Sequence, residues 1–259
     1  MDLKLRDKVI LVSGGAKGIG AAICKILARE GAIPIIIGRK SEDNKKLESE
    51  IIANGEKCSS LQAELSSPVE CEKVIAQAAS LYGRIDGVVN NAGANDGVGL
   101  ENGNYDDFMK SLHNNLVHYY LITKYALPFL KASKGAIVNI GSKTGQTGQG
   151  GTSAYAAANG GRNALTREWA VELLPYSIRV NSVIVAEAMT PLYQTWLNSF
   201  DNSEEKLANI TQRIPFENRM TKVEEIADTV AFLLSAKSGH TTGQLIHVDG
   251  GYVHLDRAL

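Results

Sequence analysis

The sequence predicts an α/β protein: a Rossmann-type, doubly wound parallel sheet with helices on both faces, in three α/β/α layers. Short, continuous apolar runs alternate with helical patterns along the 259 residues. This alternation is typical of parallel strands that are buried on both faces. A glycine-rich turn follows the first apolar run and opens the first helix. We expect a single domain over residues 1–259, with right-handed connections between its strands.

The individual elements follow from the apolar periodicity and from the glycine, proline and asparagine residues that interrupt it. Strands are expected at 9–12, 33–37, 58–63, within 86–93, and at 135–140, 178–185 and 245–248. Helices are expected near 21–28, 45–52, 69–82, 105–131, 155–174 and 223–234. Residues 191–220 show no strong strand pattern, and in this fold such an insertion forms a lid over the substrate.

The turn after the first strand contains Gly14, Gly18 and Gly20, with Lys17 and Ile19 between them. Glycines allow backbone N–H groups to approach a pyrophosphate closely, and the N-terminus of the following helix adds partial positive charge. A glycine-rich turn alone is a weak signal. Because this turn lies between a strand and a helix, it predicts a dinucleotide site.

The end of the second strand bears on the choice of dinucleotide. Gly38, Arg39 and Lys40 stand there, with no acid before Glu42. In NAD enzymes an acid near this point binds the ribose 2′-hydroxyl. Arg39 and Lys17 suit a 2′-phosphate instead, so NADP is the preferred cofactor. The alternative is that these cations are simply solvated at a strand end, and NAD then remains possible.

The composition excludes several classes of partner. The net charge is −1 and no basic run is present, so we expect neither nucleic acid nor a membrane surface as a partner. No apolar run is long enough to span a bilayer, and the first residues lack an apolar signal core. The three cysteines have no metal-ligand spacing and are expected to be reduced. We therefore predict a cytoplasmic protein without a metal.

The chemistry is expected around Ser142, which follows the fifth strand, and Tyr155, which opens a helix. Asn159 lies one turn after Tyr155 on the same helix face. Asn90-Asn91-Ala92-Gly93 follows the fourth strand, and Asp249-Gly250-Gly251 follows the last. With the Gly-x-x-x-Gly-x-Gly turn, these motifs resemble the short-chain dehydrogenase family along the whole chain.

This resemblance implies roles for individual residues. Tyr155 would take the alcohol proton while hydride passes to the nicotinamide, and Ser142 would hold the substrate oxygen. Asn115 would kink its helix and hold a water in the proton path. The remaining residues implied to contact the cofactor are Glu64, Leu65, Asn91, Ala92, Gly93, Tyr155, Asn159 and Thr190. For Glu64 the alternative to a cofactor contact is that its side chain merely faces solvent.

One position departs from the family pattern, which has Tyr-x-x-x-Lys where this chain has Asn159. The family lysine binds the nicotinamide ribose and promotes ionisation of the tyrosine. A unit charge about 4 Å away is worth about 4 kcal/mol at an effective dielectric of about 20. Asn159 can bond the ribose but carries no charge. We therefore expect turnover at neutral pH to fall about a hundredfold or more.

Other charged residues near this stretch are expected to contribute little. Arg162 lies three residues beyond Asn159, and its offset makes direct substitution for the lysine improbable. Lys143 follows Ser142, and strand alternation is expected to point it away. His113 and His118 have no partner at metal-ligand spacing and are expected at the surface.

Four segments resemble bacterial L-fucose dehydrogenases within the family: 148–150, 165–170, 186–193 and 251–259. Those enzymes oxidise the anomeric C1 hydroxyl to a lactone, which implies an aldose such as L-fucose as the substrate. A polar ligand is also favoured by polar side chains in loops after the strand ends. The candidate substrate-binding residues are Asn95, Asp96, Gln149 and Glu187, with Trp196 as an apolar face for the sugar ring.

Two further expectations concern assembly and the alternative function. Family analogy implies a homotetramer packed through the helices that carry Asn115 and Tyr155. The alternative function is a non-catalytic member of the fold that binds a dinucleotide or a sugar as a sensor or scaffold. Retention of Ser142, Tyr155 and Asn115 argues against it, because a pure binder needs none of them.

Overall fold

The computed structural model describes residues 2–255. Residue 1 and residues 256–259 of the predicted domain therefore lie outside the described residues, as does part of the segment 251–259. Seven parallel strands form one sheet in the order β3-β2-β1-β4-β5-β6-β7, which confirms the predicted fold class. The strands are β1 (Val9–Ser13), β2 (Ile33–Gly38), β3 (Ser59–Gln62), β4 (Gly87–Asn90), β5 (Ala136–Ser142), β6 (Arg179–Val185) and β7 (Leu245–Val248).

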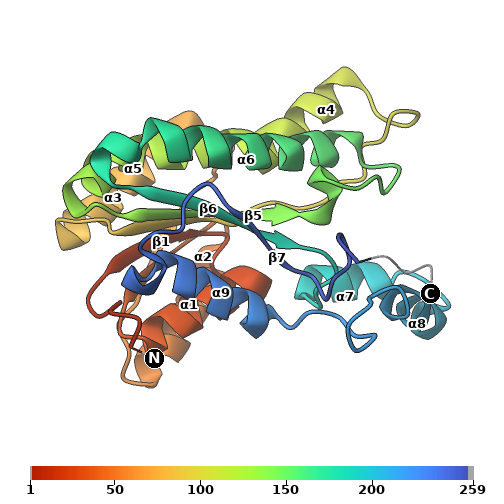
Figure 1. Cartoon of the computed structure of the whole chain (residues 1–259), viewed down its shortest axis with the longest axis horizontal. Coiled ribbons are helices and arrows are strands. Elements are labelled where there is room, and N and C mark those ends of the chain that lie inside the picture. Colours follow the sequence, from red (N-terminus) through yellow and green to blue (C-terminus); the bar gives the residue numbers. More distant parts are fainter. Residues whose placement is uncertain (1, 256–259) are drawn as a thin grey trace.

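Helices cover both faces of the sheet (Figure 1). On one face lie α3 (Pro68–Tyr82), α5 (His118–Ser133) and α6 (Ser153–Glu172). On the other lie α1 (Gly18–Arg29), α2 (Ser41–Ala53) and α9 (Val223–Leu234). Short turns of helix, η2 (Lys143–Gly145), η3 (Leu174–Tyr176) and η4 (Ala236–Ser238), connect the larger elements.

The strand β1 is a continuous apolar run because both of its faces are buried. In β1, Val9 and Leu11 pack into the apolar cluster beneath α3, α5 and α6. Ile10 and Val12 pack into the cluster beneath α1, α2 and α9. Successive side chains of a strand point to opposite faces, so the five central strands of the sheet each contribute to both clusters.

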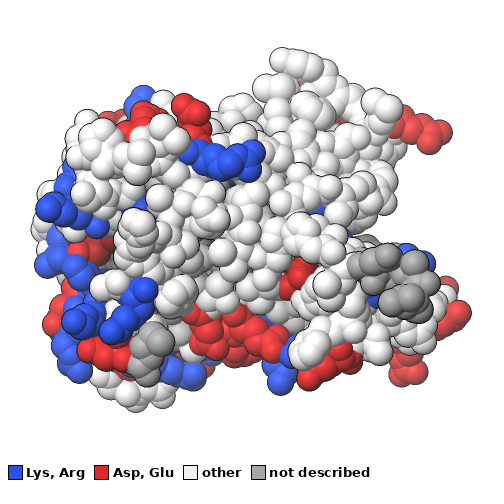
Figure 2. Space-filling model, viewed as in Figure 1, with Lys and Arg blue, Asp and Glu red and all other residues white. Residues whose placement is uncertain are grey.

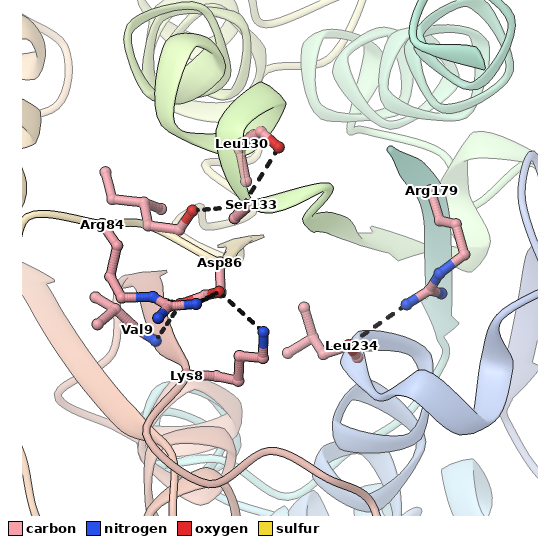
Figure 3. A network of polar contacts seen from close by, with 9 residues as sticks. Lys8, Val9, Arg84, Asp86, Leu130, Ser133, Arg179 and Leu234 are labelled. Atoms are coloured by element: carbon pink, nitrogen blue, oxygen red, sulfur yellow. Dashed lines mark hydrogen bonds and ion pairs between the residues drawn. The ribbon is translucent and has the colours of Figure 1, made fainter. Parts of the chain in front are cut away.

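The amino ends of the strands are held by Asp86, which directly precedes β4 (Figure 3). Its carboxylate accepts hydrogen bonds from the Val9 N–H at 3.0 Å, from Lys8 Nζ at 3.2 Å and from Arg84 Nε at 2.8 Å. Burial raises the pKa of Asp86, but the bonds from Arg84, Val9 and Lys8 outweigh burial and leave that pKa below its ordinary value. This network is structural.

At the opposite, carboxyl edge of the sheet, three helices extend beyond the strands: α4 (Tyr105–Leu112), α7 (Pro191–Leu197) and α8 (Ser203–Thr211) (Figure 1). The surface is hollowed between the α4 arm and the α7–α8 arm (Figure 2). The predicted lid, residues 191–220, contains α7 and α8. Open parallel sheets bind ligands at this edge.

Two kinds of feature are absent from the described residues: a helix that could cross a membrane and a cluster of metal-ligating side chains. No helix among residues 2–255 has both the length and the apolar character needed to cross a membrane. Within the same residues, no group of three or more histidines, cysteines or acids is arranged to hold a metal ion. Cys24, Cys58 and Cys71 are buried and free.

Candidate active site

The glycine turn after β1 packs directly against the loop after β4. A Cβ on Gly20 would overlap the Gly14 carbonyl oxygen and lie 2.7 Å from Asn91 Nδ2. Gly14 itself has a φ of 64°, which favours glycine. The Asn91 amide donates to the carbonyl oxygens of Ser13 at 3.0 Å and Gly14 at 3.2 Å. The turn is therefore held open as a backbone-lined cradle at the N-terminus of α1, which fits a dinucleotide pyrophosphate.

Ser13, the last residue of β1, also connects the glycine turn to the loop after β4. Its hydroxyl accepts from the backbone N–H groups of Asn91 at 2.9 Å and Ala92 at 3.1 Å. Thr190 closes the cradle from the other side, because its methyl group would lie 3.3 Å from a Cβ on Gly18. The Thr190 hydroxyl also accepts from the Tyr193 N–H and caps α7. The lid thus begins directly beside the cradle.

The residues predicted to select the cofactor lie along the edge formed by β2 and β3. Lys17 Nζ lies 2.7 Å from Asp43, and Arg39 lies 3.7 Å from Glu64. Both cations are largely exposed, each beside an acid. Glu64 also accepts from the Ser66 hydroxyl at 3.0 Å. The Leu65 side chain is buried in the apolar cluster, so only its backbone is available to a ligand.

Ser142 and Tyr155 are carried by neighbouring elements. Ser142 is the last residue of β5, and its hydroxyl accepts from the Thr144 N–H at 3.3 Å. Tyr155 lies in the first turn of α6 and is half-buried. The turn η2 packs against α6 so closely that a Cβ on Gly145 would lie 2.9 Å from the Asn159 carbonyl carbon. The strand end and the tyrosine helix therefore face each other at the carboxyl edge.

Asn115 interrupts a long helix, as predicted. The helical segment 105–133 is divided by a π-helical turn, η1 (His113–Val117), between α4 and α5. Asn115 is fully buried within it. Its side chain accepts from the Ala94 N–H at 2.9 Å and donates to Ser111 Oγ at 3.3 Å. Such turns are frequent at functional sites, and this one ties the loop after β4 to the helix.

Asn159 is fully buried, and both ends of its amide are engaged. Nδ2 donates to the Tyr155 carbonyl at 2.9 Å, and Oδ1 accepts from Arg162 Nη1 at 3.1 Å. Arg162 itself is buried, and whether it substitutes for the family lysine stays a prediction. The sequence contained the necessary signal, because Tyr155, Asn159 and Arg162 follow the i, i+4, i+7 spacing of one helix face.

The expectations for His118 and Lys143 are wrong. His118 is buried rather than at the surface, although His113 is exposed. Burial and the nearby positive charge of Arg162 lower the pKa of His118 to about 3. Lys143 does not point away into solvent, because it is buried and forms an ion pair with Glu187. The turn η2 ends the strand alternation at Ser142, and this change redirects the side chain.

The predicted substrate-binding residues all lie in segments that follow strand ends. Asn95 and Asp96 are exposed in the loop after β4. Asn95 accepts from the Gly97 N–H, and Asp96 accepts from Ser111 Oγ at 2.9 Å. Gln149 is exposed, and Trp196 on α7 has 43% of its surface exposed.

Among the predicted substrate-binding residues, Glu187 takes part in both an ion pair and a side-chain hydrogen bond. One carboxylate oxygen is paired with Lys143, and the other accepts from the Tyr193 hydroxyl at 2.8 Å. Lys143 Nζ also lies 4.1 Å from the centroid of the Tyr252 ring. Burial and the Glu187 charge raise the pKa of Tyr193, so its hydroxyl stays protonated. Lys143, Glu187 and Tyr193 therefore form a polar, charged cluster that begins at the residue directly after Ser142.

The comparisons with known proteins agree with this geometry. The family described as Enoyl-(Acyl carrier protein) reductase matches residues 14–253. The 3-oxoacyl-[acyl-carrier-protein] reductase FabG of Thermotoga maritima is 33% identical over 253 residues, which are 97% of this chain and all of the relative. The chain belongs to the short-chain dehydrogenase/reductase family. Its members are NAD(P)-dependent oxidoreductases that act on alcohols or ketones.

Two further short-chain dehydrogenases extend the comparison. The sorbitol-6-phosphate 2-dehydrogenase of Klebsiella pneumoniae is 32% identical and covers 96% of this chain and 97% of its own length. The crystal structure of Cj0485 dehydrogenase superposes with a TM-score of 0.95 at 46% identity, covering 100% of this chain and 99% of its own. The chain therefore matches each of these two relatives over nearly the whole length of both.

Proposed function

We propose that this short-chain dehydrogenase oxidises the anomeric C1 hydroxyl of an aldose such as L-fucose to the lactone. The observation that carries the proposal is the network of buried Lys143 with half-buried Glu187 and Tyr193, which begins directly after Ser142. These groups pair with one another, but Lys143 retains further N–H donors and Glu187 further acceptor positions that suit the hydroxyls of a polyhydroxylated ring. The exposed ring of Trp196 offers an apolar face for the sugar. The Klebsiella relative is itself named for a sugar-alcohol substrate.

The proposed reaction assigns one task to each residue of the site. Ser142 holds the C1 oxygen by a hydrogen bond. Tyr155 accepts the proton of the C1 hydroxyl, with Asn115 holding a water in the path by which that proton leaves. A dinucleotide held in the glycine cradle would supply the acceptor for the C1 hydride. The alcohol thus loses one proton and one hydride, which is the balance of a two-electron oxidation.

NADP is the proposed cofactor. Lys17 and Arg39 are the cations that would meet a 2′-phosphate at the edge of β2, and both are exposed enough to turn toward it. The neighbouring acids Asp43 and Glu64 weaken the attraction of these cations for a 2′-phosphate. NAD is therefore expected to bind as well, but more weakly than NADP. Arg39→Ala should raise the Kd of NADP⁺ at least fivefold and leave that of NAD⁺ within twofold, as calorimetry would measure. Equal effects on both would contradict the assignment.

The proposed reaction is tested by a screen of aldoses with NADP⁺ and NAD⁺, followed at the absorbance of the reduced dinucleotide. We expect turnover with L-fucose and related sugars, with a lactone as the product identified by mass spectrometry. Tyr155→Phe and Ser142→Ala should each lower kcat at least a hundredfold while dinucleotide affinity changes little. Unchanged dinucleotide binding with no turnover on any sugar would favour the non-catalytic alternative.

We also propose that the protein assembles as a homotetramer through α5 and α6. These helices and the adjoining η3 expose apolar side chains, among them Tyr120, Val171 and Leu174. The surface over α6 carries few charged side chains (Figure 2). A face of this kind suits a second copy of the chain. Cytoplasmic residence remains an expectation of the sequence.

A further inference from the structure

Arg162 is a buried cation without a carboxylate partner. Only 3% of its surface is exposed. Its Nε donates to the Asn115 carbonyl at 2.6 Å, and its Nη1 donates at 3.1 Å to both the Ile140 carbonyl and Asn159 Oδ1. All these acceptors are neutral, and Arg162 forms no ion pair within residues 2–255. Burying an unmatched charge is costly, so its presence beside the site points to a function.

The guanidinium is directed toward the reacting residues. Its central carbon lies 5.9 Å from the centroid of the Tyr155 ring and 4.3 Å from that of Tyr119. Nη2 has no hydrogen-bond partner among the described residues. A Cβ on Gly93 would lie 2.8 Å from Nη2, so this free donor sits directly beneath the loop after β4.

The titratable groups packed against Arg162 from the neighbouring helix do not cancel its charge. Burial, together with Arg162, lowers the pKa of His118 to about 3. Burial raises the pKa of Tyr119 to about 12. Both are therefore neutral at physiological pH. The positive charge of Arg162 consequently acts on the space around Tyr155 and the loop after β4.

Asn159 is matched to this arginine. Its Oδ1 accepts from Arg162, and its Nδ2 donates to the Tyr155 carbonyl, so the amide bridges the cation and the tyrosine. A lysine at position 159 would place an ammonium group against the guanidinium, and like charges this close repel. A neutral side chain at 159 and a cation at 162 therefore form one arrangement. The cation that bonds to Asn159 lies three residues, or about one turn, further along the helix.

We propose that Arg162 is the positioning residue that supplies the positive charge of this site. It stabilises the negatively charged form of Tyr155 that accepts the alcohol proton, and it orients Tyr155 through Asn159. This inference rests on the proposed oxidation, but it concerns a residue to which that reaction assigns no task. It also changes the expectation for activity, because the site has a cation and turnover need not be impaired.

The test compares the wild type with Arg162→Met, Arg162→Lys and the matched control Arg167→Met, an exposed arginine of the same helix. With L-fucose and NADP⁺ at pH 7, Arg162→Met should lower kcat at least thirtyfold and change the sugar KM less than threefold. The loss should shrink at alkaline pH. Arg162→Lys should retain part of the rate, and Arg167→Met should match the wild type. A wild-type pH profile in Arg162→Met would overturn the inference.

A second readout needs neither sugar nor dinucleotide. Tyrosinate absorbance is titrated in the free protein, and the component lost in Tyr155→Phe is compared between wild type and Arg162→Met. The component should appear at least one pH unit later in Arg162→Met, and coincident curves would overturn the inference. If the sugar screen shows no turnover, the proposed reaction fails while this titration still decides the role of Arg162.

Removal of Arg162 could prevent folding, so one variant retains it. Asn159→Lys keeps the arginine and adds a second cation beside it. The inference predicts that this variant is no faster than the wild type at pH 7 and melts at a lower temperature. A rate increase of tenfold or more would show that the wild-type site lacks an effective charge, and would overturn the inference.

Discussion

At the scale of single residues, the site depends on one close approach between Gly93 and Arg162. Gly93 has no side chain, and a Cβ there would lie 2.8 Å from both Arg162 Nη2 and Asn115 Oδ1. Both atoms belong to side chains fixed by further hydrogen bonds. The glycine is therefore needed for the guanidinium as well as for the loop.

Gly93→Ala is expected to destabilise the protein by about 1–3 kcal/mol through overpacking, and to lower kcat by displacing Arg162. Differential scanning calorimetry should show a melting temperature lowered by several degrees. Gly148→Ala serves as the control for stability, because nothing lies within 4 Å of a Cβ at that position. Equal melting temperatures for the two variants would contradict the packing argument.

A second residue, Asp86, is expected to make the stability of the fold depend on pH. Its pKa in the folded protein lies below the ordinary value, so its stabilising contribution is complete above about pH 5 and is lost as the pH falls through the folded value. Asp86→Asn should cost about 1–3 kcal/mol at pH 7, because the amide replaces one of the two carboxylate oxygens that accept from Val9, Lys8 and Arg84.

The expected signature of Asp86 is a gap in melting temperature between wild type and Asp86→Asn that narrows from pH 6 to pH 3. Thermal unfolding followed by circular dichroism measures it. Asp228→Asn, at an exposed position of α9, is the matched control and should show no such trend. A gap that stays constant with pH would mean that the Asp86 network does not depend on the charge of the carboxylate.

At the scale of elements, most of the architecture could be predicted from the sequence. Central strands of a parallel sheet are buried on both faces, so β1 and β2 appear as continuous apolar runs with clear ends. The kink at Asn115 was also predictable, because the family resemblance selects that asparagine. Its form as a π-helical turn was not, since it depends on bonds to Ala94 and Arg162 from distant segments.

The parts of the site that could not be predicted all involve contacts between elements far apart in sequence. Arg162 bonds to η1 and to the carbonyl of Ile140 in β5, and Lys143 pairs with Glu187 after β6. Helix periodicity placed Arg162 on the correct face, but periodicity does not say which strand or turn that face meets. The sequence therefore indicated a neutral residue in place of the family lysine, whereas the burial of Arg162 against that residue could be seen only in the structure.

At the scale of the whole molecule, the fold separates stability from function. The Asp86 network holds the amino ends of the strands (Figure 3), whereas the cradle, Ser142, Tyr155 and Arg162 lie toward the carboxyl ends. The lid helices α7 and α8 begin at Thr190, beside the glycine turn. Closure of this arm over the hollowed edge would exclude water from the reacting atoms.

The proposed assembly is tested at this scale. Light scattering on the purified chain should give a mass near four times 27.8 kDa. Val171→Glu, which places a charge on the exposed apolar face of α6, should shift the mass toward dimers or monomers. A monomeric wild type would contradict the assembly and leave the active-site assignments unaffected.

The central claim is that Asn159 and Arg162 form one matched arrangement that charges the site. It is tested most directly by kcat at pH 7 for the double variant Asn159→Lys/Arg162→Met, compared with the wild type and both single variants. We predict that the double variant is at least tenfold faster than Arg162→Met, because the lysine restores a single cation beside Tyr155. A double variant no faster than Arg162→Met would contradict the claim.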